Sequence, residues 1–518
     1  MSILSSRLKL IPGVGKLFFS ATDLEIESDF SKIASGLKLA IRIFPYSSIV
    51  ERPDSWNPEK WGFALDEGIA ECTGIQLLEA LRNEKLDHAI VVPVTNLLVD
   101  AKRIGESLKF HLEETFDATF SADLQPGANW AIIRLEVLEG LQSKHPDLMK
   151  KRGGLYWALK KPLYPFKVGY FHAPRDCTDF SADLRFNNLR THKVLSECLP
   201  PDFVSNAFSY SDWIKNPKWK KLFTDFGPSR LYIEPSNCCN SKCFGCPYPT
   251  QTRNRLNLSL DGFRKVASAF EKLKDAEILF SGIGEPFINP DFKQFVELPE
   301  ISGKIVQINS GVLEAPPKDF NWPAVTHFRM SLDANDLELF TILRPGCSWE
   351  QILECINLIH LEKSQFGRSN PELGISFAKH RLNETFSTAF LCHWKEKCQS
   401  PFGNFFFTPD SEGIKEAVSW FQIIGASDFL GEIEYPGKIR YTPLKRKLCK
   451  HALLGFHLLS DGRVTICPFD VNGRYAMGDV FKEDPTDIWE KQANFRLSHI
   501  NGELTTEPCM NCQDWYHP

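Results

Sequence analysis

The chain has 518 residues, a length that predicts about three domains of ordinary size. Its hydrophobic content of 43% and charged content of 24% are typical of a globular protein with a large core. The net charge of −5 gives no whole-chain basicity, so we expect no nucleic-acid partner. No apolar run reaches the roughly 18 residues of a membrane span, so we expect a cytoplasmic protein with no membrane partner.

The first 200 residues alternate strand-like and helical patterns. Buried strands are expected at 88–95 and 166–174, and helices at 101–116 and 129–142. Residues 206–228 are polar, basic and contain proline, which is typical of a linker. We therefore expect an α/β domain over residues 1–205.

From residue 230 the strand–helix alternation becomes regular. The expected helices begin at Asp261 and near residue 349, and the expected strands are 230–236, 277–282, 304–311, 327–334 and 372–380. Repeated strand–helix–strand units build a parallel sheet or barrel, with the chemistry at the carboxyl ends of the strands. We expect a barrel-like domain over 229–435, followed by a turn-rich, Cys-rich domain over 436–518.

Three cysteines lie on one loop directly after the first strand of this second region. Fifteen cysteines in a reducing compartment are more often metal ligands and buried thiols than disulfides. Cys239, Cys243 and Cys246 have the spacing C-x3-C-x2-C, with no fourth ligand at conventional zinc spacing downstream. A [4Fe–4S] cluster held by three thiolates leaves one iron open for a substrate or cofactor. Cys238 falls outside this spacing.

The three-cysteine spacing, with Asn240 after the first ligand, resembles the signature of the radical S-adenosylmethionine (SAM) enzymes. The resemblance implies reductive cleavage of SAM to methionine and a 5′-deoxyadenosyl radical, which abstracts hydrogen from a substrate. One position departs from the family pattern. The aromatic residue usual before the last cysteine is replaced by Gly245, with Phe244 and Tyr248 nearby.

Polar residues at the ends of the next three strands extend this resemblance. The segments GIGEP, INSG and SLDA, and the later LRPG, resemble the family's SAM-binding elements. By this resemblance the SAM-binding residues are Gly284, Glu285, Pro286, Asn309, Ser310, Ser331, Asp333 and Arg344. Carbonyl groups and a carboxylate suit the amino group of SAM, and arginine suits its carboxylate. The alternative is that these residues only form turns, where such types are common.

A second group of cysteines lies near the end of the sequence. Cys449, Cys467, Cys509 and Cys512, with Gly462 between the first two, resemble the SPASM extension of radical SAM enzymes. The resemblance implies an auxiliary [4Fe–4S] cluster. A tetrahedral zinc site is the alternative, because four cysteines including a C-x2-C pair also suit zinc.

The N-terminal region has a faint resemblance to sugar-nucleotide cytidylyltransferases. Asp100, Asp183 and Arg185 are the only candidates for the acidic metal-binding pair, and residues 36–60 lack a counterpart of the nucleotide-binding loop. We therefore expect a degenerate nucleotidyltransferase-like domain that binds a substrate or a protein, or an α/β docking domain without a ligand.

The sequence as a whole predicts an α/β protein. Its expected parts are an N-terminal nucleotidyltransferase-like domain, a partial (β/α)6 radical SAM barrel and a small SPASM domain. The expected activity is that of a radical SAM/SPASM oxidoreductase or maturase, acting on a peptide or protein side chain or on a sugar or nucleotide-sugar. Its auxiliary cluster would accept an electron or ligate substrate, and flavodoxin or ferredoxin would supply electrons. The alternative is a non-catalytic iron–sulfur or zinc protein with a ligand-binding N-terminal domain.

Overall fold

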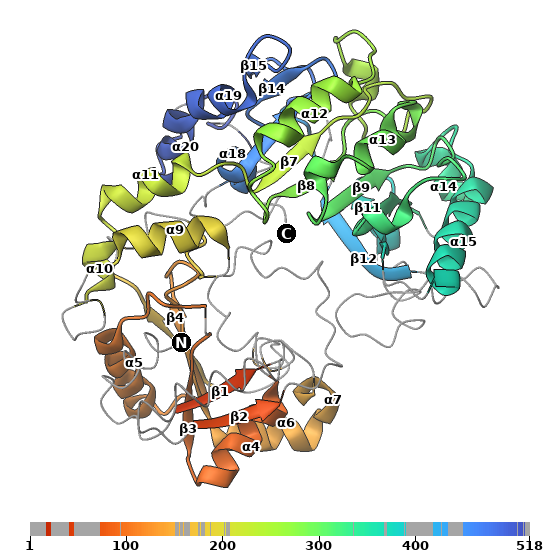
Figure 1. The fold of residues 1–518 in the computed structure, drawn as a ribbon. Helices are drawn as coiled ribbons and strands as arrows, with labels where there is room; N and C mark the ends of the chain where they lie inside the picture. Colours follow the sequence, from red (N-terminus) through yellow and green to blue (C-terminus); the bar gives the residue numbers. More distant parts are fainter. Residues whose placement is uncertain are drawn as a thin grey trace. The chain divides into compact units, whose positions relative to one another are not determined.

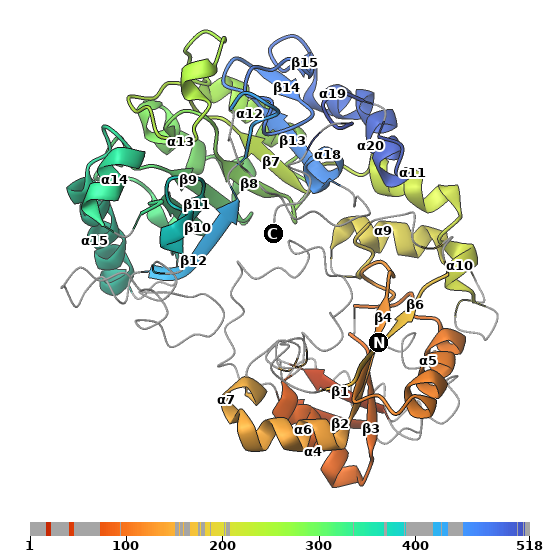
Figure 2. The ribbon, with the colours of Figure 1, turned by 180° about the vertical axis from the view of Figure 1, so that it is seen from behind.

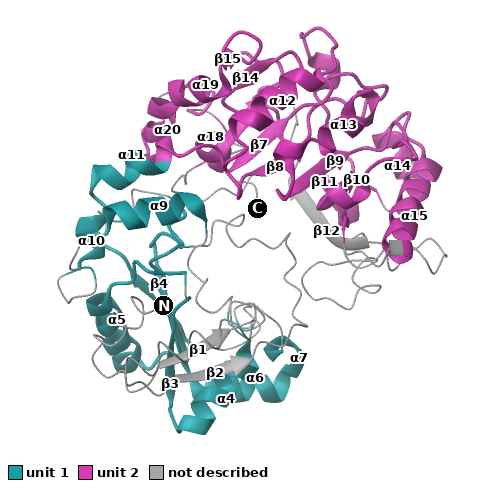
Figure 3. Cartoon of the chain, in the orientation of Figure 1, with its two compact units in different colours: residues 1–52, 58–223 teal, residues 53–57, 224–518 magenta. Residues whose placement is uncertain are grey.

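The computed structural model describes residues 17–21, 41–45, 73–150, 166–389, 418–433 and 449–512, apart from short gaps within these ranges, and two further helical positions between 150 and 166. Contacts divide the chain into two compact units (Figure 3). Unit 1 comprises Met1–Arg52 and Pro58–Phe223, and unit 2 comprises Pro53–Asn57 and Thr224–Pro518. The finer division into domains at 205, 228 and 435 stays a prediction.

Unit 1 contains a mixed four-stranded sheet in the order β3-β5-β4-β6. β5 runs antiparallel to both β3 and β4, whereas β4 and β6 are parallel. The strands of the unit are β1 Leu17–Ala21, β2 Ile41–Pro45, β3 His88–Val91, β4 Ala118–Ala122, β5 Ala131–Arg134 and β6 Val168–His172. Its helices are α4 Gly74–Glu84, α5 Ala101–Glu113, α6 Leu135–Lys144, α7 Pro146–Met149, α9 Leu189–Cys198, α10 Tyr210–Trp213 and α11 Pro217–Asp225, the last of which extends two residues into unit 2.

The expected helix over 129–142 is wrong in its first six residues. Residues 131–134 form β5, which lies between β3 and β4, and the helix α6 starts only at Leu135. Ala131, Ile132 and Ile133 are fully buried, because a central strand is covered on both faces. A short, continuously apolar run of this kind cannot be told from a buried helix by periodicity alone.

Unit 2 is built on a nine-stranded sheet in the order β12-β11-β10-β9-β8-β7-β13-β14-β15. The six strands from β7 to β12 are all parallel, as expected for the partial barrel. They are β7 Arg230–Ile233, β8 Glu277–Phe280, β9 Val306–Ser310, β10 His327–Ser331, β11 Glu372–Lys379 and β12 Val418–Gly425. The five expected strands are confirmed, and β12 was not foreseen.

Helices cover one face of these parallel strands (Figure 1). They are α12 Leu260–Ala269, α13 Phe292–Val296, α14 Leu337–Leu343 and α15 Trp349–Phe366. Short 3-10 helices are η4 Tyr248–Thr250, η5 Pro286–Ile288, η6 Pro299–Ile301, η7 Trp322–Ala324 and η8 Glu384–Phe386. Alternate strand residues such as Ile308, Phe328 and Met330 pack in the helix-covered core. Because side chains alternate along a strand, Asn309 and Arg329 lie on the opposite, polar face of the sheet.

The strands of the Cys-rich region continue the same sheet beyond β7 (Figure 2). β13 Gly455–Leu458 is parallel to β7, and β14 Arg463–Thr465 and β15 Ala476–Asp479 follow antiparallel. The helices of this region are α18 Lys450–Leu454, α19 Pro485–Lys491 and α20 Ala493–Ile500. The Cys-rich region therefore shares a continuous hydrogen-bonded sheet with the barrel.

His457 on β13, next to β7, should make the stability of the protein depend on pH. Its side chain is buried, its ring lies 4.5 Å from that of Tyr232, and Nε2 donates to the His451 carbonyl oxygen at 3.0 Å. Burial lowers its pKa from 6.5 to about 4. As the pH falls below about 6.5, this histidine is protonated in the unfolded chain but stays neutral in the folded protein until the pH nears 4. The free energy of unfolding therefore decreases between about pH 6.5 and pH 4.

We expect His457→Phe to remove this acid sensitivity. Between pH 6.5 and about pH 5 the wild-type protein should lose about 2 kcal/mol more stability than the variant. Thermal unfolding across this range measures the difference, with the exposed His192→Phe as the matched control. Parallel pH profiles for wild type and His457→Phe would contradict the assignment.

Candidate iron–sulfur and cofactor site

The three-cysteine loop follows β7 and is held by hydrogen bonds to its surroundings. The backbone N–H of Cys239 donates to the Tyr248 hydroxyl at 3.0 Å, and that of Phe244 donates to the Leu343 carbonyl at 2.7 Å. Gly245 has a φ of 79°, a left-handed conformation that is strained for other residues. This conformation explains why glycine replaces the aromatic residue usual at this position. Tyr248 instead supports the loop, a role that the sequence did not reveal.

The three thiols lie close enough to influence one another. Burial, followed by the neighbouring Cys243 and Cys239, raises the pKa of Cys246 to about 12. The pKa of Cys243 is lowered by a hydrogen bond with the Cys347 thiol and by the nearby Arg344 guanidinium. Cationic and hydrogen-bonding neighbours favour a thiolate, which is the form that binds iron. The donor set therefore fits an iron–sulfur cluster with three protein ligands.

At Gly284, the backbone of the GIGEP segment after β8 is in close contact with the backbone of the cysteine loop. A Cβ atom on Gly284 would lie 2.2 Å from the Ser236 carbonyl oxygen and 2.7 Å from that of Cys238. The next residue, Glu285, donates its backbone N–H to the Cys238 carbonyl oxygen at 2.9 Å. Only glycine allows this approach, so the backbone itself joins the ends of β7 and β8. Pro286 begins the short helix η5 that follows.

Glu285 is a buried carboxyl group surrounded by donors. Its oxygens accept from the Ser310 hydroxyl at 2.7 Å, the Gly311 N–H at 3.0 Å and the Leu313 N–H at 3.4 Å. Burial nevertheless raises its pKa to about 7. A bound cation would favour the ionised form, so the site suits a ligand that carries an ammonium group.

Asp333 and Arg344 form an ion pair at the end of β10. Arg344 Nε and Nη2 lie 2.9 and 2.7 Å from Asp333 Oδ2, and Asp333 Oδ1 accepts from the Ala378 N–H at 2.7 Å. Arg344 was expected to face the carboxylate of SAM, but its guanidinium already binds this aspartate. Two other expected SAM contacts have uncharged partners: Asn309 donates to the Ser281 hydroxyl, and the Ser331 hydroxyl accepts from Ser376.

The four cysteines of the last region also come together. Burial raises the pKa of Cys467 well above its usual value, and the adjacent Cys449, Cys512 and Cys509 contribute in that order. No group of three or more His, Cys, Asp or Glu in the described part of the chain could hold a single metal ion as it stands. A single ion needs all its ligands within about 2.3 Å, whereas each thiolate of a cluster binds its own iron, so the two requirements differ.

The expected acidic residues of unit 1 have local structural roles. The Asp100 side chain caps α5 by accepting from the Arg103 N–H at 3.2 Å, and it also accepts from the Tyr210 N–H. Asp183 forms an ion pair with Arg185 at 2.5 Å. These contacts give all three residues partners within the protein, and a role in metal binding stays a prediction.

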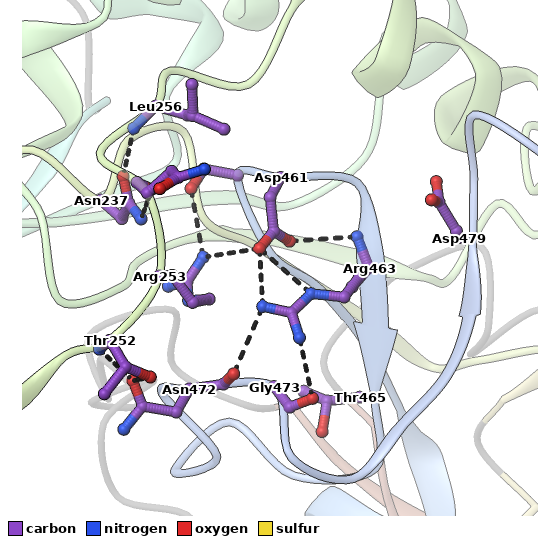
Figure 4. A network of polar contacts seen from close by, with 12 residues as sticks. Asn237, Thr252, Arg253, Leu256, Asp461, Arg463, Thr465, Asn472, Gly473 and Asp479 are labelled. Carbon is purple, nitrogen blue, oxygen red and sulfur yellow. Dashed lines mark hydrogen bonds and ion pairs between the residues drawn. The ribbon is translucent and has the colours of Figure 1, made fainter.

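A buried polar network links the barrel to the Cys-rich region (Figure 4). Arg253 Nη2 donates to both oxygens of Glu234 at 2.8 Å, and its Nε donates to the Val471 carbonyl oxygen at 2.7 Å. Glu234 Oε2 also accepts from the Ser460 N–H and hydroxyl, both at 2.9 Å. Asp461 lies 3.7 Å from Arg253 Nη1. The network ties the loop before the first cysteine to the segment around Cys467.

Two family models match the chain at these two sites. Residues 233–363 match the radical SAM superfamily, and residues 449–513 match the SPASM iron–sulfur cluster-binding domain. The chain contains a radical SAM domain and a SPASM domain. A radical SAM domain binds a [4Fe–4S] cluster and SAM, and the SPASM domain binds a further iron–sulfur cluster, so the cofactor predictions are confirmed.

Relatives resemble this chain only in part. An uncharacterized protein of Treponema pallidum is 32% identical over 75 residues, and the match spans about a fifth of that protein's length. The structure titled native anSMEcpe with bound AdoMet is 15% identical, with a TM-score of 0.37 over 55% of this chain and 86% of that one. Streptococcus suis SuiB, bound to precursor peptide SuiA, is 13% identical, with a TM-score of 0.37 over 70% and 80%.

A cytidylyltransferase from Leptospira borgpetersenii is 18% identical, with a TM-score of 0.33 over 42% of this chain and 82% of that one. At these TM-scores, the structural likenesses carry no weight for function. Among the described helices of the chain, none is long and apolar enough to span a membrane.

Proposed function

We propose that the chain reductively cleaves SAM at a [4Fe–4S] cluster held by Cys239, Cys243 and Cys246, and abstracts hydrogen from a substrate. The observation that carries this proposal is the contact between the cysteine loop and the GIGEP segment at Gly284. It brings three thiols and a buried carboxyl group to adjacent strand ends. When bound, the cluster and SAM supply the electron and the 5′-deoxyadenosyl radical.

The polar residues at the strand ends position SAM in this proposal. Glu285 and the backbone around Gly284 and Pro286 accept hydrogen bonds from its amino group. Ser310 holds the Glu285 carboxyl group in place through the 2.7 Å hydrogen bond. Asn309, Ser331, Asp333 and Arg344 would contact the ribose and the carboxylate of bound SAM. The Asp333–Arg344 pair acts as one unit, because removing either partner leaves a buried charge.

Glu285→Gln should weaken SAM binding about 10- to 150-fold, since a charge-assisted hydrogen bond contributes about 1.5–3 kcal/mol. Equilibrium binding of SAM to the reconstituted, unreduced protein measures the loss. The exposed Glu297→Gln is the matched control and should bind SAM as wild type does. Equal affinity in the Glu285→Gln variant would remove this residue from the SAM site.

The SPASM cysteines Cys449, Cys467, Cys509 and Cys512 hold the auxiliary cluster in this proposal. Four thiolates ligate a [4Fe–4S] cluster fully, so that cluster accepts an electron from the substrate or contacts it through outer atoms. A zinc ion at the same four cysteines is the alternative, and it would remove the redox role.

The substrate class remains a proposal with two members. A peptide or protein side chain would make the protein a maturase, and a sugar or nucleotide-sugar would make it a small-molecule oxidoreductase. Flavodoxin or ferredoxin would supply the electron in either case. The N-terminal unit would bind the substrate or a partner protein. The competing reading is a non-catalytic iron–sulfur or zinc protein.

Anaerobic reconstitution followed by metal analysis and product analysis tests the proposal. We expect about eight irons per chain, no zinc, and 5′-deoxyadenosine after addition of dithionite and SAM. About four irons with one zinc would assign the SPASM site to zinc. Clusters without any 5′-deoxyadenosine would overturn the enzymatic proposal.

A further inference from the structure

Arg329 is a partly buried cation in the middle of β10. The register of the sheet places it between Asn309 on β9 and Gly374 on β11. Because strand side chains alternate, Arg329 lies on the same polar face as Ser331, about 7 Å further from the carboxyl ends of the strands. It therefore lies level with Asn309 and one layer below Ser331, two of the residues that we propose for SAM.

The guanidinium of Arg329 has no anionic partner among the residues that the structure describes. Its Nε is fully buried and makes no hydrogen bond. Burial lowers its pKa, and the nearby Arg230 lowers it further, whereas the Asp333 carboxylate raises it. That carboxylate is engaged by Arg344 and by the Ala378 N–H. Arg230 differs from Arg329 in this respect, because it is paired with Glu277.

The described neighbours of Arg329 offer uncharged polar groups to a ligand. Gly374, directly opposite on β11, contributes no side chain of its own. One layer above, Ser331 and Ser376 are opposite each other and share a hydrogen bond at 3.3 Å. The side chain of Arg329 keeps limited solvent access. An arginine whose Nε is buried without a hydrogen bond lowers stability, and an apolar side chain of similar size at this position would be more stable.

We propose that Arg329 binds an anionic group of the substrate, a phosphate or a carboxylate, on the polar face of the barrel sheet next to SAM. The guanidinium fork matches both groups in a bidentate geometry. This inference rests on the proposed function, and it narrows the substrate to an anionic molecule or an acidic side chain. The carboxylate of SAM is the other source of the same chemistry.

The test compares the full-length reconstituted protein with its Arg329→Met and Arg264→Met variants. Arg264 is the matched control because its side chain is 45% exposed and lies on the surface of α12. Thermal unfolding is recorded in phosphate and in sodium chloride of equal ionic strength, and again with acetate as the carboxylate probe. We expect phosphate or acetate to raise the Tm of wild type and Arg264→Met by about 2–4 °C beyond the chloride value.

Arg329→Met should lose this anion-dependent shift and should have a higher Tm than wild type in chloride, because the unpaired charge is gone. A shift of equal size in Arg329→Met, or no shift in wild type, would overturn the inference. SAM titration separates the two sources of the anion. Unchanged SAM affinity in Arg329→Met assigns the site to the substrate, whereas a loss of tenfold or more assigns it to SAM and overturns the substrate assignment.

Different measurements test the anion-binding role of Arg329 and the proposed SAM cleavage. A wild-type protein that forms no 5′-deoxyadenosine would overturn the proposed function. The comparison of Tm values in phosphate and chloride involves no SAM cleavage and would be unaffected.

Discussion

Replacing Cys239, Cys243 or Cys246 by alanine should reduce 5′-deoxyadenosine formation to background, whereas Cys238→Ala should retain it. The three thiols influence one another electrostatically and share one loop. A [4Fe–4S] cluster with an open iron has only three protein ligands, so the loss of any one leaves too few. Each of the three variants should also lose about half of the iron, roughly four of eight atoms per chain.

Cys238 is the internal control for this experiment, because it neighbours the first ligand and has the same chemistry. Its backbone carbonyl accepts from the Glu285 N–H, and its backbone N–H donates to the Ser236 hydroxyl at 3.0 Å. An alanine preserves both backbone groups. Full activity in Cys239→Ala together with its loss in Cys238→Ala would shift the ligand register by one residue. Activity in all four variants would show that SAM cleavage does not depend on this loop.

Arg253→Met should be the most destabilising of the single changes considered outside the cysteines. Arg253 and Glu234 have side chains only 2% and 5% exposed, at a separation of 2.8 Å. Removing one partner leaves the other charge buried and unpaired, which lowers the free energy of unfolding by about 3–5 kcal/mol. Arg253 also holds the Val471 carbonyl, four residues beyond Cys467, so we expect the variant to lose auxiliary-cluster iron as well.

The double variant Arg253→Met/Glu234→Leu distinguishes this cause from general damage to the fold. The double variant removes both charges. Its loss of unfolding free energy should therefore be smaller than the summed losses of the two single variants by about 1–3 kcal/mol. Unfolding in urea, read by the fluorescence of the reconstituted protein, measures all three variants. The exposed Arg264→Met is the control. Additive effects of the two single changes would contradict a coupled, buried ion pair.

The sequence predicted the parts of the site that depend on local order along the chain. Strands with a clear apolar pattern, such as β9 and β10, were found together with the polar residues that follow them. The cysteine sets were found because their spacing is a local property. The contact at Gly284 was not foreseen, because it depends on how closely this residue approaches Ser236 and Cys238, which lie 48 and 46 positions earlier in the chain.

Other features were missed because they depend on the tertiary structure. The strands β13, β14 and β15 have only three or four residues each and exist because β7 offers an edge to pair with. The Glu234–Ser460 hydrogen bonds join residues 226 positions apart. The sequence predicted that Arg344 and Asp333 would each contact SAM. The ion pair between the two residues was not predicted, because it depends on how the end of β10 faces the end of α14.

The most direct test of SAM cleavage at the three-cysteine loop is electron paramagnetic resonance of the reduced protein with and without SAM. The Cys509→Ala/Cys512→Ala variant is suitable, because it removes two SPASM ligands and leaves the cluster at Cys239, Cys243 and Cys246. If that cluster has an iron open to SAM, adding SAM should change its spectrum, and adding methionine in place of SAM should not reproduce that change. An identical spectrum before and after SAM addition would contradict an open iron at this loop and, with it, the proposed chemistry.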